Sequence, residues 1–305
     1  MKLLVSTPHK LILVDSRSGF QTIVESHRTE YYGISWSPDG RTLCLGHSDV
    51  ENSSLLTTDS YMDSERGWLS YGSMTGPTCL SQAHQILCDG DRVIATNTGR
   101  NCITVFRTDD WFYRNYWFDE VLWDRKGKNK CGQHLNSLFL DKGQLWVVAH
   151  NHDRKSDVIC CDWPSLALIR RVSTQALMAH NVWITPTRQI VICDSMRGSV
   201  IDAKTNQILW KSEYPQVITR GLASNGRYAF IGESQIGDRT ERTFRDSRIS
   251  VVDINNWQTL GQIPLRASGN LHDIRILDEP DLCHQANPFR GSLRISPLSD
   301  RKLAA

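Results

Sequence analysis

Short apolar runs joined by tight turns recur along the whole chain. Asp-Gly and Asn-Gly dipeptides stand between two such runs at residues 39–40, 89–90 and 225–226. These dipeptides are typical of hairpin turns because their residues tolerate positive φ. A third run follows, which tends to end in an acidic residue, and then a fourth; examples of the third run are 158–162, 199–202 and 249–253. The pattern predicts repeated units of four antiparallel strands.

Six such units can be counted from the first strand of each. These strands begin near Tyr32, His84, His134, His180, Arg220 and His272, at intervals of 40 to 52 residues. Four strands repeated at this interval are typical of a β-propeller. The sixth unit has no further strands downstream, but apolar runs at 3–7, 11–15 and 20–25 supply them from the N-terminus. The sequence therefore predicts an all-β, six-bladed propeller over residues 1–301, closed by N-terminal strands that complete the last blade.

Two segments depart from the repeat. Residues 110–130 are rich in aromatic side chains between Trp111 and Trp123, with partly helical spacing. This segment either folds over the channel mouth or packs on the side of the propeller. The last four residues, 302–305, resemble a vector-derived tail and are left out of the functional interpretation.

Composition narrows the class of partner. Hydrophobic residues make up 40% and charged residues 22% of the chain, which is an ordinary globular balance. The net charge is +2 with no basic block, so the sequence predicts no nucleic-acid partner. No apolar run reaches the roughly 18 to 20 residues of a membrane helix, so no membrane partner is expected. Nine scattered cysteines without a Cys-x-x-Cys motif predict neither disulfides nor a zinc ribbon, and favour a cytoplasmic protein.

Histidines at the starts of the first strands are the candidate chemistry. First strands line the channel of a propeller, and equivalent positions come to the same height, so these six residues should meet at one mouth. His84, His180 and His272 fall on alternate blades and form a tripod suited to a divalent transition metal with an open position. Zinc or iron is the expected ion, and copper or manganese is compatible with the same ligands. His134 is either a fourth ligand or a nearby acid/base.

The other residues at this mouth suggest substrate contacts. Arg220 cannot bind a metal and is suited to a carboxylate or another anion, and Tyr32 can exchange a proton or hydrogen bond. The second strands end on the same face, where Asp194 and Glu233 are candidates to accept the second N–H of the ligating imidazoles. His134, Tyr32 and Arg220 are therefore the predicted catalytic residues.

This arrangement resembles that of the peptidyl-α-hydroxyglycine α-amidating lyases. That family holds zinc with three channel histidines and uses a tyrosine and an arginine nearby. The resemblance implies that His84, His180 and His272 are ligands, with Arg220 and Tyr32 as partners by residue type. The additional His134 and the absence of a secretory, disulfide-bearing character depart from that family. The chain also resembles uncharacterised bacterial propellers with repeats that begin in histidine, and its four histidines resemble the ligand set of the carotenoid-cleaving oxygenases, which have seven blades.

Three functions stay open on the sequence. The first is a metal-dependent enzyme of lyase or isomerase type that acts on a small polar or anionic molecule. The second is a non-haem iron or copper oxygenase or oxidoreductase that uses all four histidines. The third is a propeller that serves as an interaction module without catalysis. The substrate and the oligomeric state are not predicted.

Overall fold

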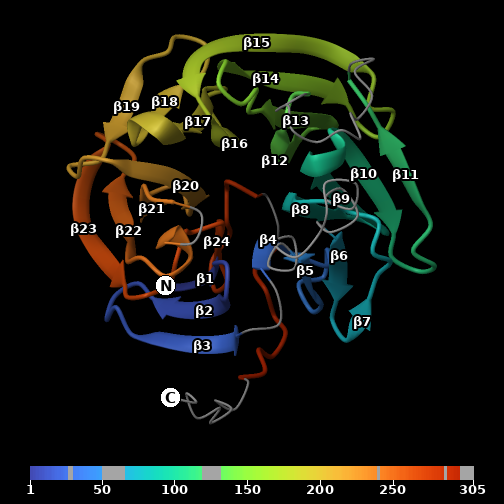
Figure 1. The fold of residues 1–305 in the computed structure, drawn as a ribbon, viewed down its shortest axis with the longest axis horizontal. Helices are drawn as coiled ribbons and strands as arrows, with labels where there is room; N and C mark the ends of the chain where they lie inside the picture. The colour runs from blue at the N-terminus through green and yellow to red at the C-terminus, as the bar shows by residue number, and fades with distance from the viewer. Residues whose placement is uncertain (27–29, 50–65, 119–131, 239–240, 285–286, 296–305) are drawn as a thin grey trace.

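The computed structural model describes residues 1–26, 30–49, 66–118, 132–238, 241–284 and 287–295. Its strands form six antiparallel sheets of four strands each, arranged around a central axis (Figure 1). Within the described ranges, the only helices are three single turns, namely η2 (Thr98–Arg100), η3 (Ser195–Arg197) and η4 (Glu241–Thr243). The predicted six-bladed β-propeller is confirmed.

The blades are numbered in chain order from the first complete sheet, and the strands of each run from the channel outward. Blade 1 contains β4 (Glu30–Trp36), β5 (Leu43–Asp49), β6 (Arg66–Tyr71) and β7 (Met74–Thr75). Blade 2 contains β8 (Ala83–Asp89), β9 (Arg92–Asn97), β10 (Cys102–Arg107) and β11 (Tyr113–Tyr116). Blade 3 contains β12 (Leu135–Asp141), β13 (Gln144–Ala149), β14 (Lys155–Asp162) and β15 (Leu168–Leu177).

The second half of the ring follows the same plan. Blade 4 contains β16 (His180–Ile184), β17 (Ile190–Asp194), β18 (Ser199–Asp202) and β19 (Ile208–Lys211). Blade 5 contains β20 (Val217–Ser224), β21 (Tyr228–Gln235), β22 (Ser247–Asp253) and β23 (Gln258–Leu265). Blade 6 contains β24 (Asp273–Ile276), β1 (Lys2–Ser6), β2 (Lys10–Asp15) and β3 (Gln21–Ser26).

Blade 6 closes the ring because it joins the two ends of the chain. β24 pairs antiparallel with β1, with Leu3 opposite Ile276 and Ser6 opposite Asp273. Leu3 and Ile276 are fully buried together with Ile274 in one apolar cluster that also holds side chains of blade 5. Each such aliphatic side chain contributes about 1.5–3 kcal/mol on burial. The predicted closure by N-terminal strands is confirmed.

The described part of the aromatic segment belongs to blade 2. Tyr113–Tyr116 forms β11, and Val105 of β10 pairs with Arg114 of that strand. Trp111 lies against Gly76 of blade 1, where a Cβ would overlap its ring. Phe112 is about half exposed at the rim of the molecule. This part therefore packs on the side of the propeller, whereas residues 119–131, including Trp123, lie outside the described residues.

The segment after β24 crosses the end of the channel at which the innermost strands finish. The N–H of Leu282 donates to the carbonyl of Ser224, the last residue of β20, over 2.6 Å. His284 Nε2 lies 3.0 Å from the hydroxyl of Ser35 in β4. Phe289 packs in the apolar cluster of blade 1 that contains Trp36. The segment therefore ties blade 5 to blade 1 at the end opposite the strand starts, while residues 296–305, including the predicted tail, lie outside the described ranges.

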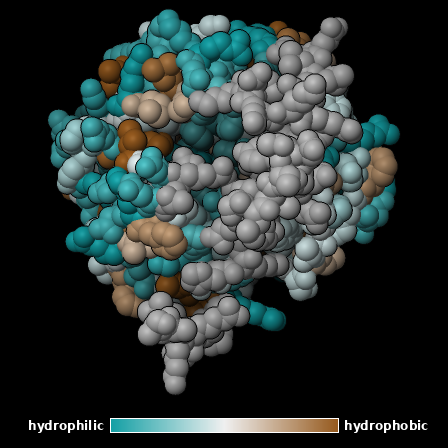
Figure 2. Space-filling view, in the orientation of Figure 1, coloured by the Kyte–Doolittle hydropathy of each residue, from teal (hydrophilic) through white to brown (hydrophobic). Residues whose placement is uncertain are grey.

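Three further features of the described residues are the state of the cysteines, the length of the helices and the polarity of the surface. All eight cysteines in the described ranges are free thiols. None of the helices that the structure describes is long and apolar enough to cross a membrane. On the face shown in Figure 2, hydrophilic residues predominate over the described surface, and hydrophobic residues form scattered patches.

Candidate functional site

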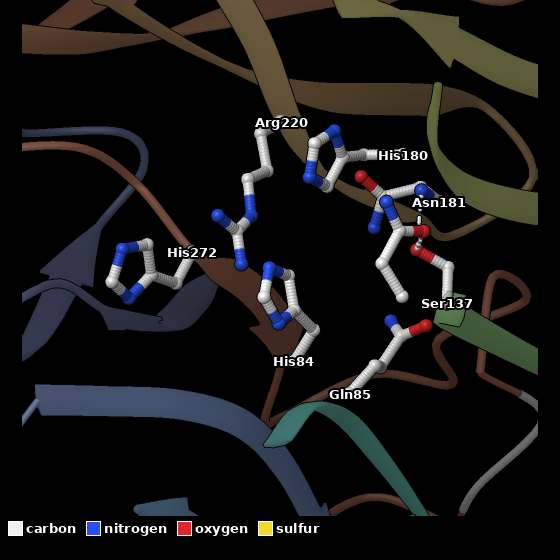
Figure 3. A pocket seen from close by; sticks show the side chains of 8 residues that line it. His84, Gln85, Ser137, His180, Asn181, Arg220 and His272 are labelled. Carbon is white, nitrogen blue, oxygen red and sulfur yellow. Dashed lines mark hydrogen bonds between the residues drawn. The ribbon is translucent and has the colours of Figure 1, made fainter. Parts of the chain in front are cut away.

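A polar pocket opens at the channel end where the innermost strands start. The empty space within it, part of which is open to solvent, is about 170 Å³. Its lining combines residues that the sequence predicted with four others (Figure 3): His84, His180, Arg220 and His272, and Gln85, Asn136, Ser137 and Asn181. All these residues come from the first few positions of the innermost strands, or lie directly before them, as the sequence predicted.

β-Bulges turn these positions toward the channel. The register of the innermost strand shifts near its start in five blades, between residues 31 and 34, 83 and 86, 135 and 137, 180 and 182, and 219 and 222. A bulge bends its strand and re-aims the side chains beside it. The residues at the start of each strand can therefore face the lumen, while those that follow pack between blades.

Four imidazoles from blades 2, 3 and 4 form a closed circuit of ring contacts. The ring of His134 lies 5.1 Å from that of His84 and 4.5 Å from that of His150, measured between centroids. The ring of His180 lies 5.4 Å from His150 and 6.1 Å from His84. His152 adds a fifth ring, 4.8 Å from His134. His150 and His152, which directly follow the second strand β13, thus lie beside the predicted histidines.

Tyr32 connects His272 to this group. Its ring stacks on His272 at 4.3 Å with an interplanar angle of 11° and lies 4.9 Å from His84. The guanidinium carbon of Arg220 lies 5.4 Å from the centre of the same ring. His272 thus lines the same pocket as His84 and His180, but its ring stacks on a phenol and not on another imidazole.

Hydrogen bonds fix the tautomer of three channel histidines. His84 and His180 each direct Nδ1 at the main-chain carbonyl two residues earlier, Gln82 at 2.8 Å and Met178 at 2.9 Å. His272 directs Nδ1 at the carbonyl of Tyr31, 2.8 Å away. A carbonyl oxygen can only accept, so Nδ1 carries the proton and Nε2 carries the lone pair when the ring is neutral. This is the arrangement in which metal-binding histidines are usually held.

The two predicted carboxylate partners serve other groups. Asp194 accepts the N–H of Leu177 at 2.9 Å and pairs with Arg197 at 3.1 Å. Glu233 accepts hydrogen bonds from the hydroxyls of Ser212 and Ser250. Their predicted role as imidazole acceptors is therefore corrected. The main chain fills this role: the acceptor lies two residues earlier for His84 and His180, and belongs to Tyr31 of the neighbouring blade for His272.

The electrostatics of the pocket favour neutral imidazoles. Burial lowers the pKa of His134 well below its ordinary value, and repulsion from the surrounding histidines lowers it further. Burial, and then the positive charge of Arg220, likewise lowers the pKa of His180. Neutral imidazole is the form that binds metals, while Arg220 keeps its charge at every physiological pH. The pocket thus combines lone-pair nitrogens with a permanent cation.

A second set of site residues follows the histidines directly in the sequence. Gln85, Asn181 and Asp273 come after His84, His180 and His272, and each reaches the next blade. Their side-chain oxygens accept main-chain N–H groups of the neighbouring innermost strand, from Leu138 at 2.6 Å, Gly221 at 2.9 Å and Ile34 at 3.1 Å. The His-Gln, His-Asn and His-Asp pairs are visible in the sequence, but the position of a histidine alone does not indicate that the next residue bonds to the neighbouring blade.

The described side chains are not arranged as a metal site. Among the described residues, no group of three or more histidine, cysteine, aspartate or glutamate side chains has a geometry that could hold an ion. The donor chemistry nevertheless fits a transition metal, because neutral imidazoles with a main-chain acceptor on Nδ1 supply Nε2 as a ligand. Binding would require the rings of neighbouring blades to turn so that their Nε2 atoms converge.

Comparisons with known proteins agree on the fold alone. No protein-family model matches the chain, and neither does any curated protein. A propeller chain in the crystal structure of the nidogen/laminin complex is similar, with a TM-score of 0.65 and 11% identity over 90% of this chain and 97% of that one. The computationally designed Ika8 protein gives a TM-score of 0.44 and 12% identity over 89% of this chain and 73% of that one. At such identities the nidogen/laminin likeness supports the six-bladed propeller class and no activity.

Proposed function

We propose that the histidine-lined mouth is the active site of a metal-dependent enzyme that acts on a small polar or anionic molecule. The observation that carries the proposal is the hydrogen bond from Nδ1 of His84, His180 and His272 to a main-chain carbonyl. Three blades present an imidazole in the same tautomer at the same mouth. Histidines that bind metals are usually held in this way, with the second ring nitrogen hydrogen-bonded to an acceptor.

His84 and His180 combine this hydrogen bond with a ring contact to each other, so they are the residues that would hold the ion, together with His272 or with His134, whose ring contacts His84. When bound, a zinc or iron ion would act as a Lewis acid that polarises a substrate oxygen. Arg220 lies on the same pocket and would bind and orient an anionic group. Tyr32 contacts both His84 and His272 and donates its hydroxyl proton to Glu30 over 3.2 Å, so it can move a proton at the pocket edge. These roles suit a lyase or isomerase.

A second candidate is a propeller that binds an anion without turnover. Arg220 is a permanent cation in the same pocket as three imidazoles, and its charge disfavours a divalent ion beside it. Among the described residues that line the pocket none is a carboxylate, although the nearby Asp273 carboxylate interacts with the Arg220 charge. An anionic ligand could bind beside Arg220 without a metal ion.

Metal content separates the two functions. Protein purified without added metal and then titrated with zinc or ferrous iron should hold one ion per chain. The double variant His84→Gln/His180→Gln should lose it, whereas His284→Gln, which changes a buried imidazole at the opposite end of the channel, should keep it. Full occupancy in the double variant, or none in the parent protein, would refute the metal site. If turnover is found, an anaerobic assay separates a lyase from an oxygenase, because only the oxygenase stops.

A further inference from the structure

Gln85 and Asn181 present oriented amide groups to the pocket. The oxygen of Gln85 accepts the N–H of Leu138 at 2.6 Å, and the oxygen of Asn181 accepts the N–H of Gly221 at 2.9 Å. An amide whose oxygen is engaged in this way must turn its NH₂ group to the other side. Both side chains line the pocket (Figure 3), and neither amide nitrogen has a hydrogen-bond partner among the described residues.

The third member of the series shows why these two are donors. Asp273 makes the same bond to the next blade, with its carboxylate 3.1 Å from the N–H of Ile34. Its charge is balanced by the buried guanidinium of Arg275, 2.9 Å away, and it does not line the pocket. The interblade bond thus requires only a side-chain oxygen. An amide at residues 85 and 181 meets that requirement and adds an N–H₂ donor that the bond does not use.

We propose that this pocket binds the carboxylate of a small organic acid between Gln85 Nε2, Asn181 Nδ2 and the guanidinium of Arg220. The proposal rests on the proposed function, because it names the substrate class of the same site. The free amide nitrogens of Gln85 and Asn181 and the guanidinium of Arg220 supply only N–H donors, one of them charged, and none of the described lining residues is a carboxylate.

The neutral histidines indicate which further group the ligand should carry next to its carboxylate. Nε2 of His84 and His180 carries a lone pair in the observed tautomer, so each ring can accept a hydrogen bond but repels an oxygen anion. A hydroxyl group next to the carboxylate would donate to one of these nitrogens, or would contact an ion bound to them. A 2-hydroxy acid such as glycolate therefore fits better than acetate or inorganic phosphate.

Two isosteric substitutions test the proposal. Gln85→Glu and Asn181→Asp each keep an oxygen for the interblade N–H and replace the NH₂ donor with a second oxygen. Asn206→Asp is the matched control, because Asn206 also accepts a main-chain N–H, from Gln175 at 2.6 Å, but lies on the outer part of blade 4. Calorimetric titration with glycolate at pH 8, in the presence of a chelator, should show binding to the parent and to Asn206→Asp. Each pocket variant should bind about ten- to a hundredfold more weakly.

The outcomes separate this proposal from the metal site. Equal glycolate affinity in the parent and both pocket variants would overturn it, as would binding of phosphate or acetate in preference to glycolate. Glycolate binding by protein that takes up no zinc would refute the metal while supporting the carboxylate site, and zinc uptake without glycolate binding would do the reverse. If a variant does not fold, the side-chain amide NMR signals of Gln85 and Asn181 in the parent should shift on addition of glycolate, and unchanged signals would refute the proposal.

Discussion

The ion pair between Asp273 and Arg275 should dominate the stability of blade 6. The guanidinium of Arg275 is fully buried, lies 2.9 Å from the Asp273 carboxylate, and donates to the carbonyls of Ile274 at 2.8 Å and Ile34 at 3.2 Å. Asp273 in turn accepts the N–H groups of Ile34 and Ile274, both at 3.1 Å. The perturbation that tests this arrangement is Arg275→Met, which keeps much of the side-chain volume and removes the charge.

The expected cost of Arg275→Met is about 3–5 kcal/mol, because the substitution leaves the Asp273 carboxylate buried without its counter-ion. Burial already raises the pKa of Asp273 with Arg275 in place, and without the guanidinium the pKa should rise further. Burial raises the pKa of Asp281 to about 6, and the Arg275 charge opposes that shift, so Asp281 is a second buried carboxylate that depends on Arg275. The double variant Asp273→Asn/Arg275→Met removes the carboxylate that pairs directly with Arg275, keeps one acceptor oxygen and leaves Asp281 in place. It should therefore be more stable than Arg275→Met alone, by about 2 kcal/mol.

Urea unfolding at pH 7, completed as a double-mutant cycle, measures both costs. A second series at pH 5 checks the cause. In Arg275→Met, the folded protein binds a proton at Asp273 more readily than the unfolded chain does, so its deficit relative to the parent should shrink as the pH falls. A cost below about 1 kcal/mol, or additive effects of the two substitutions, would refute the reasoning.

Two further predictions concern the pH dependence of stability and the packing of Gly232 against the strand that carries Arg220. The lowered pKa values of His134 and His180 mean that the unfolded chain, with an ordinary value of 6.5, takes up protons that the folded protein does not. Urea titrations should show the free energy of unfolding falling below pH 6.5 by up to about 1.4 kcal/mol per pH unit for each imidazole, and a flat profile would contradict this. Gly232→Ala would place a Cβ against the carbonyl oxygen of Arg220 and should cost about 1–3 kcal/mol and weaken anion binding. Gly261→Ala, with open space around its Cβ, should be nearly neutral by the same measurements.

Much of the fold could be predicted because its signals are local. The Asp89-Gly90 and Asn225-Gly226 turns lie between the paired strands β8 and β9 and β20 and β21, as their turn chemistry predicts. The N-terminal strands complete blade 6 because a propeller without them would leave an exposed edge. The sequence did not predict that Tyr113 and Tyr116 lie on an outer strand. Burial on such a strand depends on the neighbouring elements and does not give a clear alternation of apolar and polar residues.

The sequence predicts which histidines line the pocket, but not how their rings contact one another. Equivalent positions in the repeat place His84, His180 and His272 on one pocket, which follows from propeller symmetry. Symmetry does not reveal that the ring of Tyr32 lies between His272 and His84, or that His150 contacts His134. These contacts depend on the rotamers that the bulges impose, and bulge positions arise from pairing between strands. The atoms that accept the Nδ1 protons are main-chain carbonyl oxygens, so the residue types in the sequence do not indicate them.

In each even-numbered blade, a histidine at the channel mouth is followed directly by a residue that bonds to the next blade. In His84-Gln85 and His180-Asn181, the first side chain faces the mouth and the second bonds to the next blade. The bond fixes the spacing between innermost strands, and that spacing fixes the distances between the imidazoles. In His272-Asp273, one carboxylate oxygen of Asp273 makes the interblade bond. The other oxygen accepts from the N–H of Ile274 and pairs with Arg275, so blade 6 stabilises the ring without adding an N–H donor to the pocket. The interblade bond needs only an oxygen, so the amides at the other two positions leave N–H donors that the proposed carboxylate would accept from. The same two side chains would therefore bind the proposed ligand and hold neighbouring blades together.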